Sequence, residues 1–242
     1  RVGASRADCD AVAYLSHQRA LRAQREGRFT SVVPIKTRSG SVSLDECIRP
    51  SLTAERLAAM PPAFLALGAA GSDAVQLSQY PELTKIAHVH TAGNSPAMFD
   101  AAAVLLVGSK MLASDKGLIP KVRIVDSVTC CGEPLEVVSG CVAATKTILS
   151  RNKLSPSDVD VFEIHEAFAA TIVKLQRELE IDSARLNVNG GCIALGHPMG
   201  ATGAIMAGTA IDELIRCDGS IGVIAASGAA GSGSALLVER CY

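Results

Sequence analysis

The stretch that decides the fold reads Asn-Val-Asn-Gly-Gly-Cys-Ile-Ala-Leu-Gly-His-Pro-Met-Gly-Ala-Thr-Gly and spans Asn187–Gly203. At its centre, His197 stands between Gly196, which permits a tight turn close to a ligand, and Pro198, which fixes the direction of the chain beyond it. Strand-like residues precede this segment and helix-like residues follow it. The pattern predicts an imidazole at a strand-to-helix corner, where open α/β sheets place their binding sites.

Two further polar side chains end or follow predicted strands. His165 ends the apolar run Val159–Ile164, and Ser227 follows the apolar run Ile221–Ala226. Apolar runs of this length, bounded by turn residues, are typical of buried strands. Because parallel strands share a carboxyl edge, we expect His165, His197 and Ser227 to lie around one pocket.

Strand and helix patterns alternate after residue 121, which predicts a layered α/β domain with a mixed, mostly parallel sheet. We expect strands over Val122–Val128, Val159–Ile164, Leu186–Asn189, Ile221–Ala226 and Ala235–Glu239, and helices over Cys141–Arg151, Glu166–Leu179 and Gly200–Cys217. The last two strands flank the glycine-rich turn Gly228–Gly233, so they are expected to pair antiparallel.

The first half of the chain shows weaker patterns. A capping box at Ser5 predicts a helix that runs to Glu26, followed by a strand over Phe29–Lys36. Arg49–Ala87 is rich in proline and glycine and predicts an irregular layer, and Met98–Ala113 predicts an apolar helix. The chain therefore divides into residues 1–90, 91–120 and 121–242.

Composition limits the class of protein. Apolar residues make up 48% of the chain, enough for a core, and the net charge of −1 argues against a nucleic-acid partner. No apolar run approaches the ~20 residues of a membrane span. The eight cysteines show no C-x-x-C pair, which favours reduced thiols in an intracellular protein. Clustered metal ligands at short spacing are absent too, so we expect no metal site.

Alternative interpretations of these motifs remain. The glycines of Gly191–Gly196 could cradle a phosphate, but His197 stands where a P-loop has lysine. His165-Glu166 does not begin a zinc helix, because Ala169 replaces the second histidine; as a structural residue, His165 would cap a helix. Cys192, five residues before His197, is either a thiol nucleophile or a small packing residue.

Taken together, the motifs resemble thiolases. The segments His165–Ala169, Gly190–Gly203 and Ser227–Gly233 look like the three C-terminal catalytic loops of that family, and Ser5–Phe29 looks like the helix of its loop domain. The resemblance implies a thiolase-like layered fold. Residues 1–90 would belong to the loop domain, 91–120 to the end of the N-terminal domain and 121–242 to the C-terminal domain.

The resemblance also implies an acyl transfer from acyl-CoA, either thiolytic cleavage of a 3-ketoacyl-CoA or the reverse condensation. His197 would activate a cysteine nucleophile and help bind the oxyanion, and His165 would orient a water that completes the oxyanion hole. Gly196 and Ala229 belong to the loops around it.

Binding partners follow from the same resemblance. Arg49 matches a CoA-contacting arginine, and Arg56 falls where another contact is expected, though with a different side chain. Coenzyme A thioester would be a substrate, with no cofactor. A homodimer or tetramer is expected, in the mitochondrion, the cytoplasm or a peroxisome-like organelle.

Two departures from the family pattern put turnover in question. The nucleophilic cysteine belongs to a segment upstream of Arg1, and the second catalytic cysteine aligns with Ser227. A serine hydroxyl is a far weaker base than a thiolate, so the sequence predicts impaired chemistry. The alternative is a thiolase-like acyl-CoA-binding protein or a partner subunit without turnover.

Overall fold

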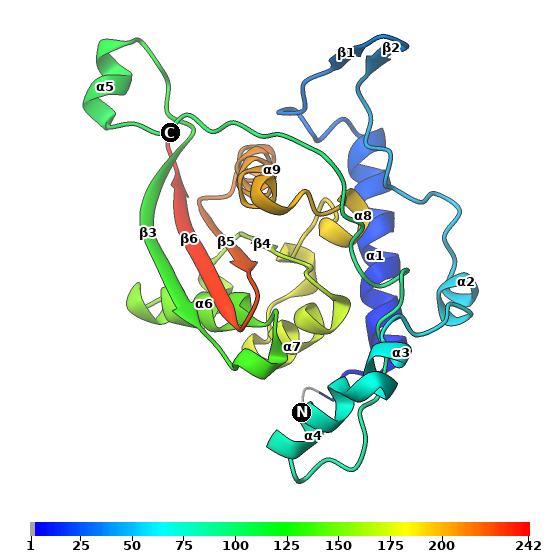
Figure 1. Ribbon diagram of the computed structural model, residues 1–242. Helices are drawn as coiled ribbons and strands as arrows, with labels where there is room; N and C mark the ends of the chain where they lie inside the picture. Colours follow the sequence, from blue (N-terminus) through cyan, green and yellow to red (C-terminus); the bar gives the residue numbers. More distant parts are fainter. Residues whose placement is uncertain (1–2) are drawn as a thin grey trace.

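A computed structural model describes residues 3–242, and it places a mixed sheet between two layers of helices (Figure 1). The sheet has the strand order β3-β6-β5-β4, with the bounds Val122–Cys131 for β3, Val161–Ile164 for β4, Ile221–Ser227 for β5 and Ser232–Arg240 for β6. Helices α6 (Gly140–Arg151) and α7 (Ala169–Leu179) cover one face, and α9 (Thr202–Arg216) covers the other.

The predicted layered α/β class is confirmed. Strands β3, β4 and β5 run in the same direction, and β6 is reversed. Because β6 lies between β3 and β5, both of its pairings are antiparallel, while β4 pairs parallel with β5. The antiparallel pairing expected for the last two strands is present, and the tight turn between them explains it.

The alternation of side chains along the strands builds two cores. Phe162 and Ile164 of β4 face α6 and α7, whereas Val161 of the same strand faces α9. This period of two is what a strand buried on both faces requires. β4 is consequently the best-buried strand, and it ends where His165 begins.

Helix α1 (Arg6–Arg25) packs on the edge of this domain rather than apart from it. Its capping box at Ser5 is formed as predicted. Cys9 and Ala13 of α1 share a buried cluster with Ala169 of α7 and Ile193 of α8 (Cys192–Leu195). The long helix beside α7 and α8 in Figure 1 thus reaches both segments that carry the histidines.

The rest of the first half holds short elements. A hairpin joins β1 (Ile35–Thr37) to β2 (Gly40–Val42), so most of the strand predicted over Phe29–Lys36 is wrong. Within the predicted irregular layer lie α2 (Ala54–Ala58), α3 (Leu65–Leu67), η1 (Gly68–Ser72) and α4 (Asp73–Gln79). Of these, η1 is π-helical. The second half of the chain contains the 3-10 turns η2 (Pro134–Glu136), η3 (Pro156–Asp158), η4 (Ser183–Arg185) and η5 (Met199–Ala201).

The helix predicted over Met98–Ala113 is also wrong. Residues 98–109 form neither helix nor strand, and α5 (Lys110–Asp115) follows them. Figure 1 shows this segment crossing from α8 past α9. Val104 is 94% exposed and Leu106 is 83% exposed, so no packing supports a helix here, and short isolated helices are marginal in water.

Two other expectations need correction. Helix α7 begins at Ala169 rather than at Glu166, since Phe168 has extended backbone angles. The strand predicted over Leu186–Asn189 is reduced to one parallel bridge between Leu186 and Phe162, because Asn187 has a positive φ of 45° that ends the strand. None of the helices among residues 3–242 has the length and apolar character needed to cross a bilayer.

Glycines bring α6 against β6 near the end of β5. An ideal Cβ on Gly140 would lie 2.0 Å from the carbonyl oxygen of Ser232, so no side chain fits there. This close approach places the first turn of α6 beside Ser227, the last residue of β5.

We expect Gly140→Ala to lower the free energy of unfolding by about 1–3 kcal/mol, because the methyl group forces α6 away from β6. Gly203→Ala is the matched control, since an added Cβ in the first turn of α9 meets nothing within 4 Å. Helix propensity alone favours alanine at both sites by up to about 1 kcal/mol. Urea unfolding measures the free energy of unfolding of both variants. Equal stabilisation of the two would contradict the close approach of α6 to β6.

Candidate active site

The two histidines singled out from the sequence lie against each other. His165 follows β4, and its backbone N–H donates to the carbonyl oxygen of Ala225 on β5 over 2.8 Å. His197 follows α8. The ring centroids are 4.5 Å apart, with an angle of 43° between the ring planes. The fold therefore brings together two imidazoles that are 32 positions apart in the chain.

His197 is held from several sides. Gly196 has a φ of 88°, and an ideal Cβ on it would overlap the Phe99 ring, so glycine is required for this turn. The backbone N–H of His197 donates to the carbonyl oxygen of Ala97 over 2.8 Å. Its Nδ1 lies 2.8 Å from the hydroxyl oxygen of Thr202 at the start of α9. These contacts leave Nε2 as the nitrogen free for chemistry.

His165 has one satisfied and one unsatisfied ring nitrogen. Its Nδ1 accepts a long hydrogen bond of 3.4 Å from the backbone N–H of Ser227, which places the ring proton on Nε2. Within the described chain, the buried Nε2 has no hydrogen-bond partner. Burial, and then the neighbouring His197, lower the pKa of His165 to about 4. The ring is consequently neutral at pH 7, with an unpaired N–H donor.

Ser227 lies beside His165 and at the start of α6. Its hydroxyl oxygen accepts a hydrogen bond of 2.9 Å from the backbone N–H of Cys141, in the first turn of that helix. A helix N-terminus favours negative charge, so this position suits an anionic side chain. Ala229 lies further on, exposed in the turn between β5 and β6.

Cys192 completes the cluster. Its side chain is 5% exposed, and burial together with the carboxyl groups of Glu166 and Glu163 raises the pKa of its thiol well above the usual range. A protonated, buried thiol favours packing over nucleophilic attack. Ligand atoms of His165, Cys192 and His197 nevertheless lie within 4.8 Å of one another. Sequence spacing did not reveal this spatial group, because the fold brings His165 to the other two.

A carboxylate that sequence reasoning did not single out holds the site together. Glu166 accepts hydrogen bonds from the hydroxyl of Ser16 on α1 over 2.8 Å and from the backbone N–H of Ile193 on α8 over 3.0 Å. A third comes from the side-chain amide of Asn187 over 3.1 Å. The sequence could have revealed Glu166, because it is the single acidic residue in the apolar stretch after His165.

Asn187 links this carboxylate to β4. Its side chain accepts from the backbone N–H of Ile164 and donates to the carbonyl oxygen of the same residue, over 2.7 and 2.9 Å. The amide thus makes the pair of hydrogen bonds that a neighbouring strand would otherwise make. The end of β4, the loop before His197 and α1 are tied together around one buried group.

The two arginines expected to contact CoA are bonded to residues other than these histidines. The backbone N–H of Arg49 donates to Nδ1 of the buried His17 over 3.2 Å. Arg56 is exposed, and its guanidinium donates to the backbone oxygen and hydroxyl of Ser51 over 3.0 and 3.1 Å. Among the described residues, no hydrogen bond joins either arginine to His165 or His197.

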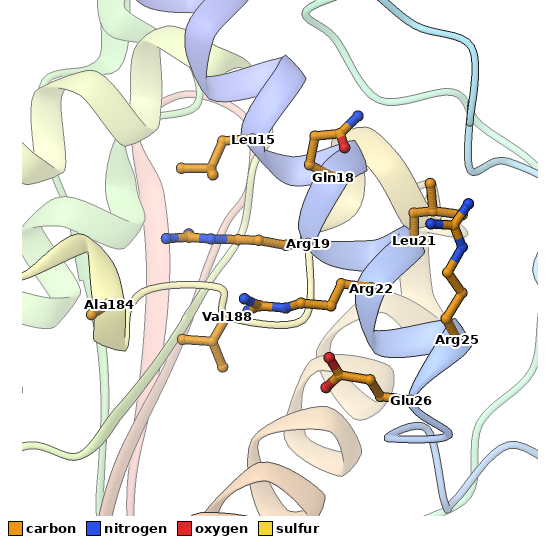
Figure 2. A pocket seen from close by; sticks show the side chains of 9 residues that line it. All are labelled: Leu15, Gln18, Arg19, Leu21, Arg22, Arg25, Glu26, Ala184 and Val188. Carbon is orange, nitrogen blue, oxygen red and sulfur yellow. The ribbon is translucent and has the colours of Figure 1, made fainter.

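A cavity of about 730 Å³ lies between α1 and the segment that carries Ala184 and Val188, and it includes none of the predicted site residues. Figure 2 shows α1 on one side of it and Ala184 and Val188 on the other. Arg19 on its wall is already bonded to the backbone oxygens of Leu186 and Ser183.

Comparisons with known proteins agree with the fold. The family model described as the thiolase C-terminal domain matches residues 118–240, and the thiolase N-terminal domain matches residues 1–78. The chain therefore belongs to the thiolase family. The 3-oxoadipyl-CoA/3-oxo-5,6-dehydrosuberyl-CoA thiolase of Escherichia coli (strain K12) is 37% identical over 244 aligned residues, and the 3-ketoacyl-CoA thiolase of Bacillus subtilis (strain 168) is 34% identical over 256.

Solved structures give the same result. The acetyl-CoA acetyltransferase of Bacillus anthracis superposes with a TM-score of 0.82 at 35% identity, and human mitochondrial 3-ketoacyl-CoA thiolase with 0.79 at 29%. Each alignment covers 98% of this chain but 56% of the other chain. The E. coli match likewise covers 98% and 56%, and the B. subtilis match 100% and 60%. The chain thus spans little more than half the length of these relatives.

Glu166→Gln should destabilise the protein by about 1.5–3 kcal/mol, because an amide NH₂ would face donors that now share a carboxylate. Glu178→Gln is the control, since Glu178 is partly exposed and pairs with Lys146 and Lys174 at the surface. That change should cost no more than about 1 kcal/mol. Chemical unfolding compares the free energies of unfolding of the two variants. An equal loss in both would show that the hydrogen bonds of Glu166 do not stabilise the site.

The free energy of unfolding should fall as the pH drops from 6.5 to 4. Burial, and then the positive charge of Arg49, lower the pKa of His17 from its ordinary 6.5 to about 4 in the folded protein. Between these values the unfolded chain binds the extra proton, so His17 contributes a slope of up to about 1.4 kcal/mol per pH unit. Urea unfolding of the wild type and of His17→Gln across this pH range isolates the contribution of His17. If the free energy of unfolding depends on pH in the same way in both proteins, the prediction is wrong.

Proposed function

We propose that the protein is an acyl-CoA acyltransferase of thiolase type, which cleaves 3-ketoacyl-CoA thioesters with CoA or runs the reverse condensation. Its membership of the thiolase family supports this proposal, as do relatives named 3-ketoacyl-CoA thiolase and beta-ketoadipyl-CoA thiolase. The reaction also needs a cysteine nucleophile besides the residues named below.

The observation that carries the proposal is the unpaired Nε2–H of His165 next to His197. A neutral imidazole that offers a buried, preoriented donor can stabilise a developing oxyanion, either directly or through a water. His197 lies beside it with Nδ1 engaged by Thr202, so Nε2 would take the proton of the attacking thiol. Burial also lowers the pKa of His197, which keeps it ready as a base near neutral pH.

Ser227 would occupy the position of the second acid–base group. It lies beside His165 and receives the Cys141 N–H at the start of α6. A thiol there, with an ordinary pKa of ~8.5, would be lowered further by the helix N-terminus. A hydroxyl does not ionise in this range, so we expect slow carbon–carbon chemistry in the wild type.

The remaining parts of the proposal concern binding and assembly. Arg49 and Arg56 would contact CoA, and Gly196 and Ala229 would shape the oxyanion loops. The exposed apolar residues of the segment 98–109, including Val104 and Leu106, support burial against further protein in a homodimer or tetramer. The free cysteines support an intracellular setting, in the mitochondrion, the cytoplasm or a peroxisome.

Ser227→Cys should raise turnover of acetoacetyl-CoA with CoA by about 10²–10⁴-fold, the usual contribution of a general base, with little change in KM. Ser227→Ala, which removes the hydroxyl but adds no base, serves as the matched control and should stay as slow as the wild type. The measurement is steady-state thiolysis by the full-length protein.

Two outcomes would oppose this account. If the wild type turns over acetoacetyl-CoA as fast as Ser227→Cys does, another group must transfer the proton. Binding of acetoacetyl-CoA without turnover by every variant would favour an acyl-CoA-binding protein instead.

A further inference from the structure

Three metal-ligating side chains meet at the end of β4, and within residues 3–242 they form the only such group of histidine, cysteine and acidic residues. We propose that His165, Cys192 and His197 bind a zinc-like divalent cation, with its fourth position open. Neither the family models nor the names of the relatives include a metal.

The donor set and its spacing fit this class of ion. Two imidazoles and one thiolate suit zinc and other borderline-soft cations, and they disfavour magnesium and calcium, which prefer oxygen ligands. Zinc bonds of ~2.0–2.3 Å in a tetrahedral arrangement separate ligand atoms by about 3.4–3.6 Å. The ligand atoms here lie within 4.8 Å of one another, so small side-chain rotations bring them into position.

Each histidine already has an arrangement that ligation can use. The hydroxyl of Thr202, 2.8 Å from Nδ1 of His197, is the kind of outer partner that orients metal-bound imidazoles through their second nitrogen. His165 offers a buried Nε2 with no other partner among the described residues. Ligation through it moves the ring proton to Nδ1, where it would face the backbone N–H of Ser227, so the ring must turn away and give up this 3.4 Å hydrogen bond. The cation has to offset this loss.

The binding step has a simple proton balance. Cys192 binds as the thiolate and releases its proton to solvent, and no oxidant or reductant takes part. The bound cation would occupy one nitrogen of His165 and one nitrogen of His197. Resting on the function proposed above, occupancy would therefore block the oxyanion site and the base, and so act as a reversible inhibitor.

Cobalt(II) chloride titration of the 242-residue protein is the direct test. We expect one Co²⁺ per chain, with the tetrahedral absorption bands and the thiolate charge-transfer band of a Cys/His site. Cys192→Ser should lose the charge-transfer band, and His197→Gln should weaken binding more than tenfold. Cys9→Ala is the matched control, because Cys9 is buried on α1 outside the cluster, and it should bind as the wild type does.

A second pair of variants tests the arrangement without removing a ligand. Thr202→Val should weaken Co²⁺ binding by about 10–100-fold, the usual cost of losing an outer partner, and Thr202→Ser should restore it. Circular dichroism checks that each variant is folded. Wild type without tetrahedral bands, or a charge-transfer band that persists in folded Cys192→Ser, would overturn the proposal. Because the readout is spectroscopic, it succeeds or fails independently of any acyl transfer.

Discussion

The buried carboxylate of Glu166 is the constraint on which the rest of the site depends. A charged or polar group removed from water must find partners, and this one receives hydrogen bonds from α1, from the segment before α8 and from α8 itself. Burial raises its pKa, while the hydrogen bonds and Arg19 oppose that shift. The three segments are fixed relative to β4 because each satisfies the same group.

The position of the imidazoles follows from that arrangement. His165 directly precedes Glu166, and His197 follows the loop that the carboxylate holds. With both ends anchored, the ring centroids lie 4.5 Å apart. Burial of His165 and partial burial of His197 lower both pKa values and favour neutral rings. Preorganisation of this kind allows one unpaired donor to persist, although an unsatisfied buried N–H costs about 1–3 kcal/mol. Such a cost is common where a protein binds a ligand or a transition state.

The sequence predicted the elements whose signals are local. The capping box at Ser5 and the alternation of strands and helices after residue 121 both produced the expected elements. It failed where contacts between distant residues decide. Asn187 replaces a strand by pairing its side-chain amide with Ile164. The apolar segment 98–109 forms no helix, because most of its large apolar side chains, including Val104 and Leu106, are exposed. The histidines could be found from their motifs. The hydrogen bond from Ser16 to Glu166 could not, because the two residues are 150 positions apart in the sequence.

The central claim is that His165 is a neutral imidazole with its proton on Nε2, next to His197. Long-range ¹H–¹⁵N correlation spectra of the ¹⁵N-histidine-labelled protein at pH 7 report the tautomer of each ring, and His165→Gln assigns the resonance. The account predicts a His165 ring with a protonated Nε2 and an unprotonated Nδ1 that does not titrate between pH 7 and 5. A ring protonated on Nδ1 alone, or one that becomes imidazolium near pH 6.5, would contradict it.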